Sequence, residues 1–199
     1  MSRMTGSLVF VTWLLAMTTI STEAQKPAVL DTEGRAVRSG VEYYIVPAAT
    51  DIAGGLTLID RNNSCPLYVG QEPLAEVVSL GTSVIFTPYA AGETVIRESR
   101  DYTITFQAAT ICIQSTSWRV GQEDPETNRR FVVTAGRASY FTIGKVGTGI
   151  YNIAFCPTES CPNCRVRCGN AGILVENGKR LVALDGPAFP FAFRRVRDN

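Results

Sequence analysis

Short runs in which apolar and polar residues alternate fill this sequence from residue 43 onward, and they constrain the fold more than any other feature. A period of two is typical of strands that bury one face, and the runs are rich in branched and aromatic residues. Turn residues lie in nearly every gap, and no stretch keeps a helical period. About a dozen short strands at this spacing predict an all-β barrel or sandwich in one domain. The runs cover residues 43–46, 56–59, 84–86, 94–96, 102–106, 118–120, 131–134, 140–143, 150–155, 173–175, 181–184 and 189–193.

The first 24 residues have a different composition. Arg3 lies near the start, an apolar run extends from Leu8 to Ile20, and a small-residue cleavage site ends at Ala24. This order is typical of a secretory signal peptide, and the apolar run is short for a membrane-spanning helix. We therefore expect residues 1–24 to be removed. Residues 25–199 are then expected to form a single secreted domain, extracellular or vacuolar, without a membrane anchor.

Six cysteines follow, and an even number in an oxidising compartment favours three disulfides. Spacing favours a pair between the two distant cysteines and leaves the pairing of the other four open. Those four could instead bind zinc, which secretion disfavours, and a thioredoxin-like use of their CxxC pattern lacks a βαβ context. The distant cysteines are Cys65 and Cys112, and the close group is Cys156, Cys161, Cys164 and Cys168.

The chain contains no histidine, and its net charge is +1. Without histidine, the Ser-His-Asp and Cys-His catalytic pairs and histidine-ligated metal sites are excluded. The carboxylates Glu123, Asp124 and Glu126 lie in one predicted loop, so the sequence gives no acid/base pair across a cleft. We therefore expect a protein that is not an enzyme, holds no metal or cofactor, and binds no nucleic acid.

Ordered motifs across nearly the whole of residues 25–199 carry a family resemblance. They are Val29-Leu30-Asp31-Thr32-Glu33-Gly34-Arg35-Ala36-Val37, Tyr43-Tyr44-Ile45, Ser64-Cys65-Pro66-Leu67, Ser117-Trp118-Arg119-Val120 and Tyr151-Asn152-Ile153-Ala154-Phe155-Cys156-Pro157. These motifs resemble the soybean Kunitz trypsin inhibitor family, and the close group of cysteines resembles its miraculin-like branch. The resemblance implies a secreted plant protein with a pseudo-threefold β-trefoil fold. It also implies disulfides between Cys65 and Cys112, Cys156 and Cys168, and Cys161 and Cys164.

The same resemblance implies inhibition of serine proteases through one exposed loop. The corresponding residues here are Thr87, Pro88, Tyr89, Ala90, Ala91, Gly92 and Glu93. In the family's type inhibitor a basic residue follows the Pro-Tyr pair, whereas Ala90 stands there in this chain. Alanine would leave the aspartate of a trypsin-like pocket desolvated and unpaired. We therefore expect an elastase-like or subtilisin-like target, with Ala90 or Ala91 as the primary contact. Ser39 stands where the type inhibitor has an asparagine that supports the loop.

The expected partner is a target protease, a serine protease first and a cysteine protease second, bound by a monomer. Because Ala90 departs from the family pattern, the alternative is a non-inhibitory miraculin-like protein for defence, storage or taste-related binding.

Two further patterns lead to predictions. Asn62-Asn63-Ser64 is a glycosylation sequon in a predicted turn, which makes Asn62 a candidate modification site. Three aromatic segments, residues 42–46, 117–120 and 150–155, are candidates for corresponding strands in three repeated units.

Overall fold

The computed structural model describes residues 25–49, 51, 53–75 and 77–197, so the predicted signal peptide lies outside the described residues. Strands make up the regular secondary structure of this part of the chain, which contains no helix able to cross a membrane. The strands are β1 (Glu42–Pro47), β2 (Leu56–Ile59), β3 (Tyr68–Gln71), β4 (Val84–Pro88), β5 (Tyr102–Phe106), β6 (Arg119–Asp124), β7 (Arg129–Val133), β8 (Thr142–Gly147), β9 (Ile150–Phe155), β10 (Gly169–Asn170), β11 (Gly172–Glu176), β12 (Lys179–Ala183) and β13 (Phe191–Arg195).

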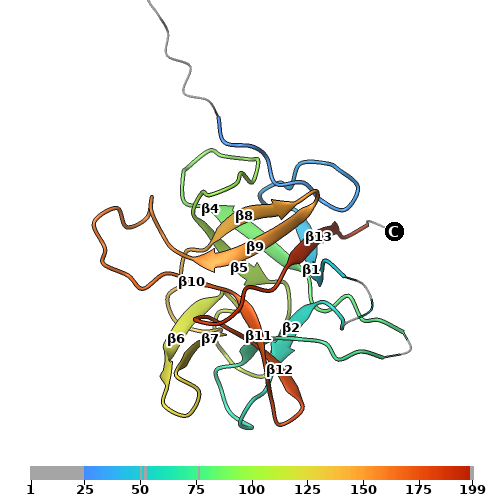
Figure 1. Cartoon of the computed structure of the whole chain (residues 1–199), viewed down its shortest axis with the longest axis vertical. Coiled ribbons are helices and arrows are strands. Elements are labelled where there is room, and N and C mark those ends of the chain that lie inside the picture. The colour runs from blue at the N-terminus through green and yellow to red at the C-terminus, as the bar shows by residue number, and fades with distance from the viewer. Residues whose placement is uncertain (1–24, 50, 52, 76, 198–199) are drawn as a thin grey trace, which may run out of the picture.

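The strands β1, β4, β5, β8, β9 and β13 form a barrel in the upper half of the molecule (Figure 1). Strand β13 pairs with β1 and β9, β1 with β4, β4 with β5, and β8 with β9, all antiparallel. A single bridge between Tyr102 and Phe141 brings β5 to β8 and closes the ring. Closure removes the unpaired edges that would otherwise offer a template for pairing with other chains.

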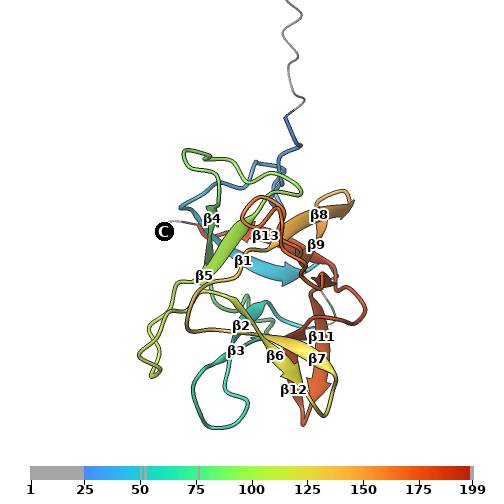
Figure 2. The same ribbon diagram turned by 90° about the vertical axis from the view of Figure 1, so that its left-hand side faces the viewer.

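Three hairpins, β2–β3, β6–β7 and β11–β12, cover one end of this barrel, which we call the hairpin end (Figure 2). Strands β3, β7 and β12 also pair with one another, so the hairpins form a triangular cap. Between them lies a small buried cluster of Phe131, Val133, Leu181 and Ala183.

The chain passes three times through the order barrel strand, hairpin, barrel strand. The units run from β1 to β4, from β5 to β8, and from β9 to β13, with the two-residue β10 added in the third. This is the predicted β-trefoil. One detail of the predicted repeat is wrong: residues 42–46 and 150–155 lie in the first strands of their units, but residues 117–120 lead into the second hairpin. The corresponding strand is β5.

One tyrosine from the first strand of each unit lies in the core. Tyr43, Tyr102 and Tyr151 are each at most 1% exposed. Strand alternation explains their burial, because every second residue of a strand points to the same face. In β5 the pattern is complete: Tyr102, Ile104 and Phe106 are buried, and the threonines between them are half-buried.

One predicted strand is missing from the structure, and strand β3 of the structure was not predicted. Residues 94–96 do not form a strand, because Val95 makes only an isolated bridge to Arg38. Residues 68–71 form β3, which the sequence pattern did not predict, since Gly70 and Gln71 interrupt the apolar alternation. Gly70 is required there by packing: a side chain would meet Ile59 and the carbonyl of Arg180.

The three disulfides are the ones that the family resemblance implies. Cys65 is bonded to Cys112, which ties the β2–β3 connection to the segment between β5 and β6. The other two, Cys156–Cys168 and Cys161–Cys164, close the segment between β9 and β10.

Candidate functional site

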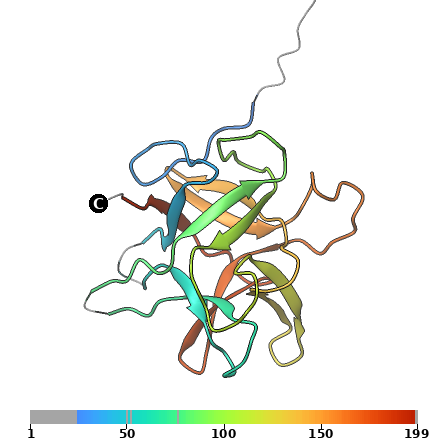
Figure 3. The same ribbon diagram turned by 180° about the vertical axis from the view of Figure 1, so that it is seen from behind.

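Residues 89–101 connect β4 to β5 at the end of the barrel opposite the hairpins, and we call them the β4–β5 loop. In Figure 3 this loop, in green, stands between the blue N-terminal segment and the orange segment 156–168. The N–H of Tyr89 donates to the carbonyl of Asp101 at 2.9 Å and closes the base of the loop. The ring of Tyr89 lies edge-on against Tyr140, with centroids 5.3 Å apart. The loop therefore leaves and rejoins the barrel at one fixed point.

The tip of the loop presents small residues. Ala91 and Gly92 are exposed, Ala90 is half-buried, and Tyr89 is 48% exposed. The N–H of Glu93 donates to the carbonyl of Ala90 at 3.4 Å, which makes a turn. Gly92 has a φ of +81°, a conformation that glycine adopts without the strain of a side chain. These contacts place the Tyr89–Gly92 backbone at the surface in a defined conformation.

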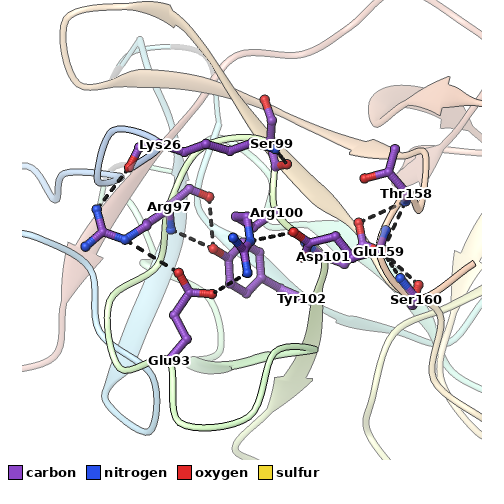
Figure 4. A network of polar contacts seen from close by, with 10 residues as sticks. All are labelled: Lys26, Glu93, Arg97, Ser99, Arg100, Asp101, Tyr102, Thr158, Glu159 and Ser160. Atoms are coloured by element: carbon purple, nitrogen blue, oxygen red, sulfur yellow. Dashed lines mark hydrogen bonds and ion pairs between the residues drawn. The ribbon is translucent and has the colours of Figure 1, made fainter. Parts of the chain in front are cut away.

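The Glu93 side chain turns inward from the tip and lies between two arginines (Figure 4). One carboxylate oxygen is 3.5 Å from Nε of Arg97, and the other is 3.4 Å from a terminal nitrogen of Arg100. The side chain of Glu93 is 15% exposed. Because Glu93 directly follows the tip, these ion pairs fix the direction in which the chain leaves it.

The N-terminal segment supports the second half of the loop. Val95 bridges to Arg38, and Arg97 bridges to Ala28, so the loop backbone lies between two stretches of that segment. The N–H of Ser39 donates to the carbonyl of Thr94 at 3.0 Å. Ser39, which the sequence analysis singled out as a support, thus contacts the loop through its backbone.

The buried side chain of Tyr102 binds the backbone of the second half of the loop. Its hydroxyl accepts a hydrogen bond from the N–H of Arg97 at 2.6 Å and donates to the Arg97 carbonyl at 2.9 Å. Burial raises the pKa of this phenol above its ordinary value, so it stays protonated and able to donate. The hydroxyl of Tyr43 accepts from the N–H of Arg38 in the same way, at 3.1 Å.

The spacing behind these two contacts is a sequence signal that could have identified Arg97. In each case an arginine precedes a buried tyrosine by five residues, at the start of corresponding strands. Sequence analysis also missed Arg100 and its partner Glu159, for which no local signal exists, because the two are far apart in the chain.

The remaining predicted sites lie elsewhere or are structural. Asn62 is exposed in the connection between β2 and β3, at the hairpin end and away from the β4–β5 loop. Among the residues that the structure describes, no group of three or more His, Cys, Asp or Glu side chains could hold a metal ion.

The geometry exposes a short peptide segment at the surface. The exposed groups at the tip are a phenol ring, methyl groups and backbone amides, and the charged side chains nearby face one another. Such an arrangement suits binding in the groove of another protein, in which backbone groups form hydrogen bonds and small side chains fill a pocket.

A family model described as trypsin and protease inhibitor, the legume Kunitz family, matches residues 29–195. This chain belongs to that family. It is 42% identical over 192 residues to Kunitz type trypsin inhibitor 104 of Medicago truncatula, with 92% of each chain covered.

Two further Kunitz comparisons bear on function. The chain is 34% identical over 212 residues to miraculin of Synsepalum dulcificum, covering 96% of this chain and 94% of miraculin. The solved structure of the bifunctional α-amylase/subtilisin inhibitor of Oryza sativa matches with a TM-score of 0.71 at 34% identity, covering 86% of this chain and 100% of that one. Kunitz relatives therefore include proteins named for different targets.

Proposed function

We propose that this chain is a secreted Kunitz inhibitor of a serine protease with a small apolar primary pocket, subtilisin-like or elastase-like. The inhibitory segment is residues 87–93, and Ala90 is the primary contact. The observation that carries the proposal is the combination of a tip with small exposed residues and partly buried ion pairs of Glu93, which directly follows the tip. The name of the rice relative, which includes subtilisin, supports the choice of target class.

Rigidity is what makes such a loop an inhibitor. A segment already fixed in its bound shape loses little conformational freedom on binding, so most of the contact energy becomes affinity. If the protease cuts the loop, the hydrogen bond of Tyr89 before the cut and the ion pairs and backbone bridges after it hold the new ends together, which favours resynthesis of the bond. The loop therefore occupies the active site without being released as product.

The residue at the primary contact sets the target. A methyl group fills a small apolar pocket, whereas a deep pocket with an aspartate at its base keeps an unpaired buried charge when alanine enters. Ala90 therefore disfavours trypsin and favours proteases that accept small residues.

The test is a titration of the oxidised protein, residues 25–199, against trypsin, chymotrypsin, elastase, subtilisin and papain. We expect stoichiometric inhibition of subtilisin or elastase, and a loss of about a hundredfold or more in Ala90→Asp, because a carboxylate would be buried unpaired. Ala90→Arg should gain trypsin inhibition. Ala108→Arg places the same charge on an exposed alanine outside the loop and should gain none.

Two outcomes would contradict the proposal. Inhibition that survives Ala90→Asp but is lost in Ala91→Asp would move the primary contact by one residue. Inhibition unaffected by either change would show that another surface binds the protease.

The alternative is a non-inhibitory, miraculin-like binding protein. It is favoured by Ala90, which is small and half-buried where the type inhibitor carries a long basic side chain. Silence of the wild-type protein against all five proteases would support this alternative.

A further inference from the structure

Asp101, the last residue of the β4–β5 loop, has a buried carboxylate that binds another part of the chain. Its side-chain oxygens accept hydrogen bonds from the backbone N–H groups of Thr158, Glu159 and Ser160 at distances between 2.8 and 3.2 Å. The hydroxyl of Ser160 donates to it as well, at 2.8 Å. Asp101 is 1% exposed. Successive N–H groups that converge on one carboxylate fix the backbone that carries them.

An ion-pair chain runs from this contact to the tip of the loop (Figure 4). Nε of Arg100 is 2.6 Å from a carboxylate oxygen of Glu159, and a terminal nitrogen of Arg100 is 3.4 Å from Glu93. Glu93 directly follows the exposed tip. The order Glu159, Arg100, Glu93 therefore connects residues 158–160 to the tip without passing through the barrel core.

Residues 158–160 are themselves held on both sides by disulfides. Cys156 lies two residues before them and is bonded to Cys168, and Cys161 follows them directly and is bonded to Cys164. This segment, residues 158–160, is called the supporting segment below. The disulfides fix both of its ends, and the hydrogen bonds to Asp101 fix the backbone between them.

We propose that the supporting segment positions the inhibitory loop through Asp101 and Arg100. The inference rests on the proposed function for its effect on inhibition, but its effect on the loop can be measured without any protease. Arg100 and Asp101 are positioning residues: they contact Glu93 and the base of the loop, not the protease. Their role is to keep the tip in one conformation and to hold the ends together after a cut.

The experiment compares Glu159→Gln and Arg100→Gln with wild type by hydrogen exchange of the amides of residues 87–94, together with the thermal unfolding midpoint. Removing one charged group from this series of ion pairs should speed exchange about tenfold, since a partly buried ion pair that restrains the loop is lost and the loop opens locally. The unfolding midpoint should change little, because the barrel core is untouched.

Glu176→Gln is the matched control. Glu176 binds Arg61 at the hairpin end with a distance of 2.8 Å, so the change removes the same chemical group from a comparable ion pair. It should lower the unfolding midpoint and leave exchange in residues 87–94 as in wild type. Asp101→Asn is a stronger test, because it changes the carboxylate that binds the supporting segment. If this variant does not fold, Glu159→Gln and Arg100→Gln still test the proposal, because both keep Asp101.

Inhibition supplies the second readout. Where the wild type inhibits a protease, Glu159→Gln and Arg100→Gln should weaken inhibition about tenfold and be cut faster at the loop. Wild-type protein that inhibits none of the five proteases would contradict the proposed function, and loop exchange alone would then decide the positioning role. Exchange that is unchanged in both variants, or equally faster in Glu176→Gln, would overturn the inference.

Discussion

Arg61 and Arg100 lie at opposite ends of the trefoil, and each joins two carboxylates from distant parts of the chain. Arg61 makes contacts of 2.8 Å with both Glu176 and Asp124, and its guanidinium lies 4.3 Å from the centre of the Phe131 ring. Arg100 lies 2.6 Å from Glu159 but 3.4 Å from Glu93, and it has no such aromatic platform among its described contacts.

This difference suggests that Arg61 contributes to the global stability of the fold, whereas Arg100 contributes to the local order of the β4–β5 loop. Arg61 joins all three hairpins, because it follows β2, Asp124 ends β6 and Glu176 ends β11. Its side chain is 12% exposed, so its ion pairs are screened little by solvent. Arg100 is 29% exposed and joins two loops that could open without unfolding the barrel. We expect changes at the hairpin end to alter global stability, and changes at the β4–β5 loop to alter local order and binding.

The largest expected effect comes from the disulfide at the hairpin end. Replacing Cys65 and Cys112 by serine should lower the free energy of unfolding by about 4 kcal/mol, because a ring spanning 47 positions is opened. The same change at Cys161 and Cys164 should cost about 2 kcal/mol, since that ring spans only three. Urea unfolding of both variants measures the difference. Equal losses of unfolding free energy in the two variants would contradict the comparison, because the two ends of the molecule would then contribute equally to stability.

Arg61→Ala should have the next largest effect. It leaves Asp124 and Glu176 without their partner and should lower the free energy of unfolding by about 3 kcal/mol. Arg61→Lys keeps the charge but cannot bind both oxygens of Glu176 and should cost less. Inhibition measured at a temperature where both variants are folded should match wild type. A loss under 1 kcal/mol for Arg61→Ala would contradict the assignment of stability to this end.

Acid should weaken two ion pairs near the hairpin end. Arg130 and Arg167 lower the pKa of Asp185; burial alone would raise the pKa of Asp124, but its hydrogen bond to Arg61 holds the pKa below the ordinary value. A carboxyl with a lowered folded-state pKa stabilises the fold above its unfolded-state pKa of about 4, and this contribution disappears as the pH falls through the folded-state value. We therefore expect a stability plateau from neutral pH down to about pH 5 and a decline below about pH 4.

Two variants test this assignment. Asp124→Asn and Asp185→Asn should lower stability at neutral pH and flatten the decline in urea unfolding measured between neutral pH and strong acid. A decline as steep as in wild type would place the acid-sensitive groups elsewhere.

Sequence patterns could predict the strands because their determinants are local, and the family resemblance then implied the trefoil. Alternation gives strands, Asn177-Gly178 gives a hairpin turn, and ordered motifs give the family. The assignment of residues 117–120 to a first strand was wrong because Trp118, although buried, approaches the core from the connection before β6. An aromatic residue alone therefore does not distinguish a barrel strand from the entry to a hairpin.

The contacts that support the loop could not be predicted, because they join residues that are far apart in the sequence. Arg100 lies in the connection between the first and second units and Glu159 lies in the third, and nothing near either residue indicates its partner. The candidate segment 87–93 was placed by the Pro-Tyr pair of the family pattern, and in the structure it begins in the last two residues of β4 and continues into the β4–β5 loop. The contacts that support this loop come from the N-terminal segment and from residues 158–160, whose positions depend on the whole fold.

The smallest expected effect gives the sharpest test of the two ends. Gly92 and Gly178 have φ angles of +81° and +76°, and in both places a side chain would meet nothing within 4 Å. Alanine should therefore introduce the same intrinsic strain of about 1 kcal/mol at either position. At Gly178 the strain lies in the tight turn between β11 and β12, so it should appear fully in the free energy of unfolding.

At Gly92 the loop can relax, so global stability should change by less than about 0.5 kcal/mol while inhibition weakens several-fold. Equal unfolding energies for Gly92→Ala and Gly178→Ala would mean that the β4–β5 loop is as much a part of the cooperative fold as the hairpins, and that presentation and stability are not separated in this trefoil.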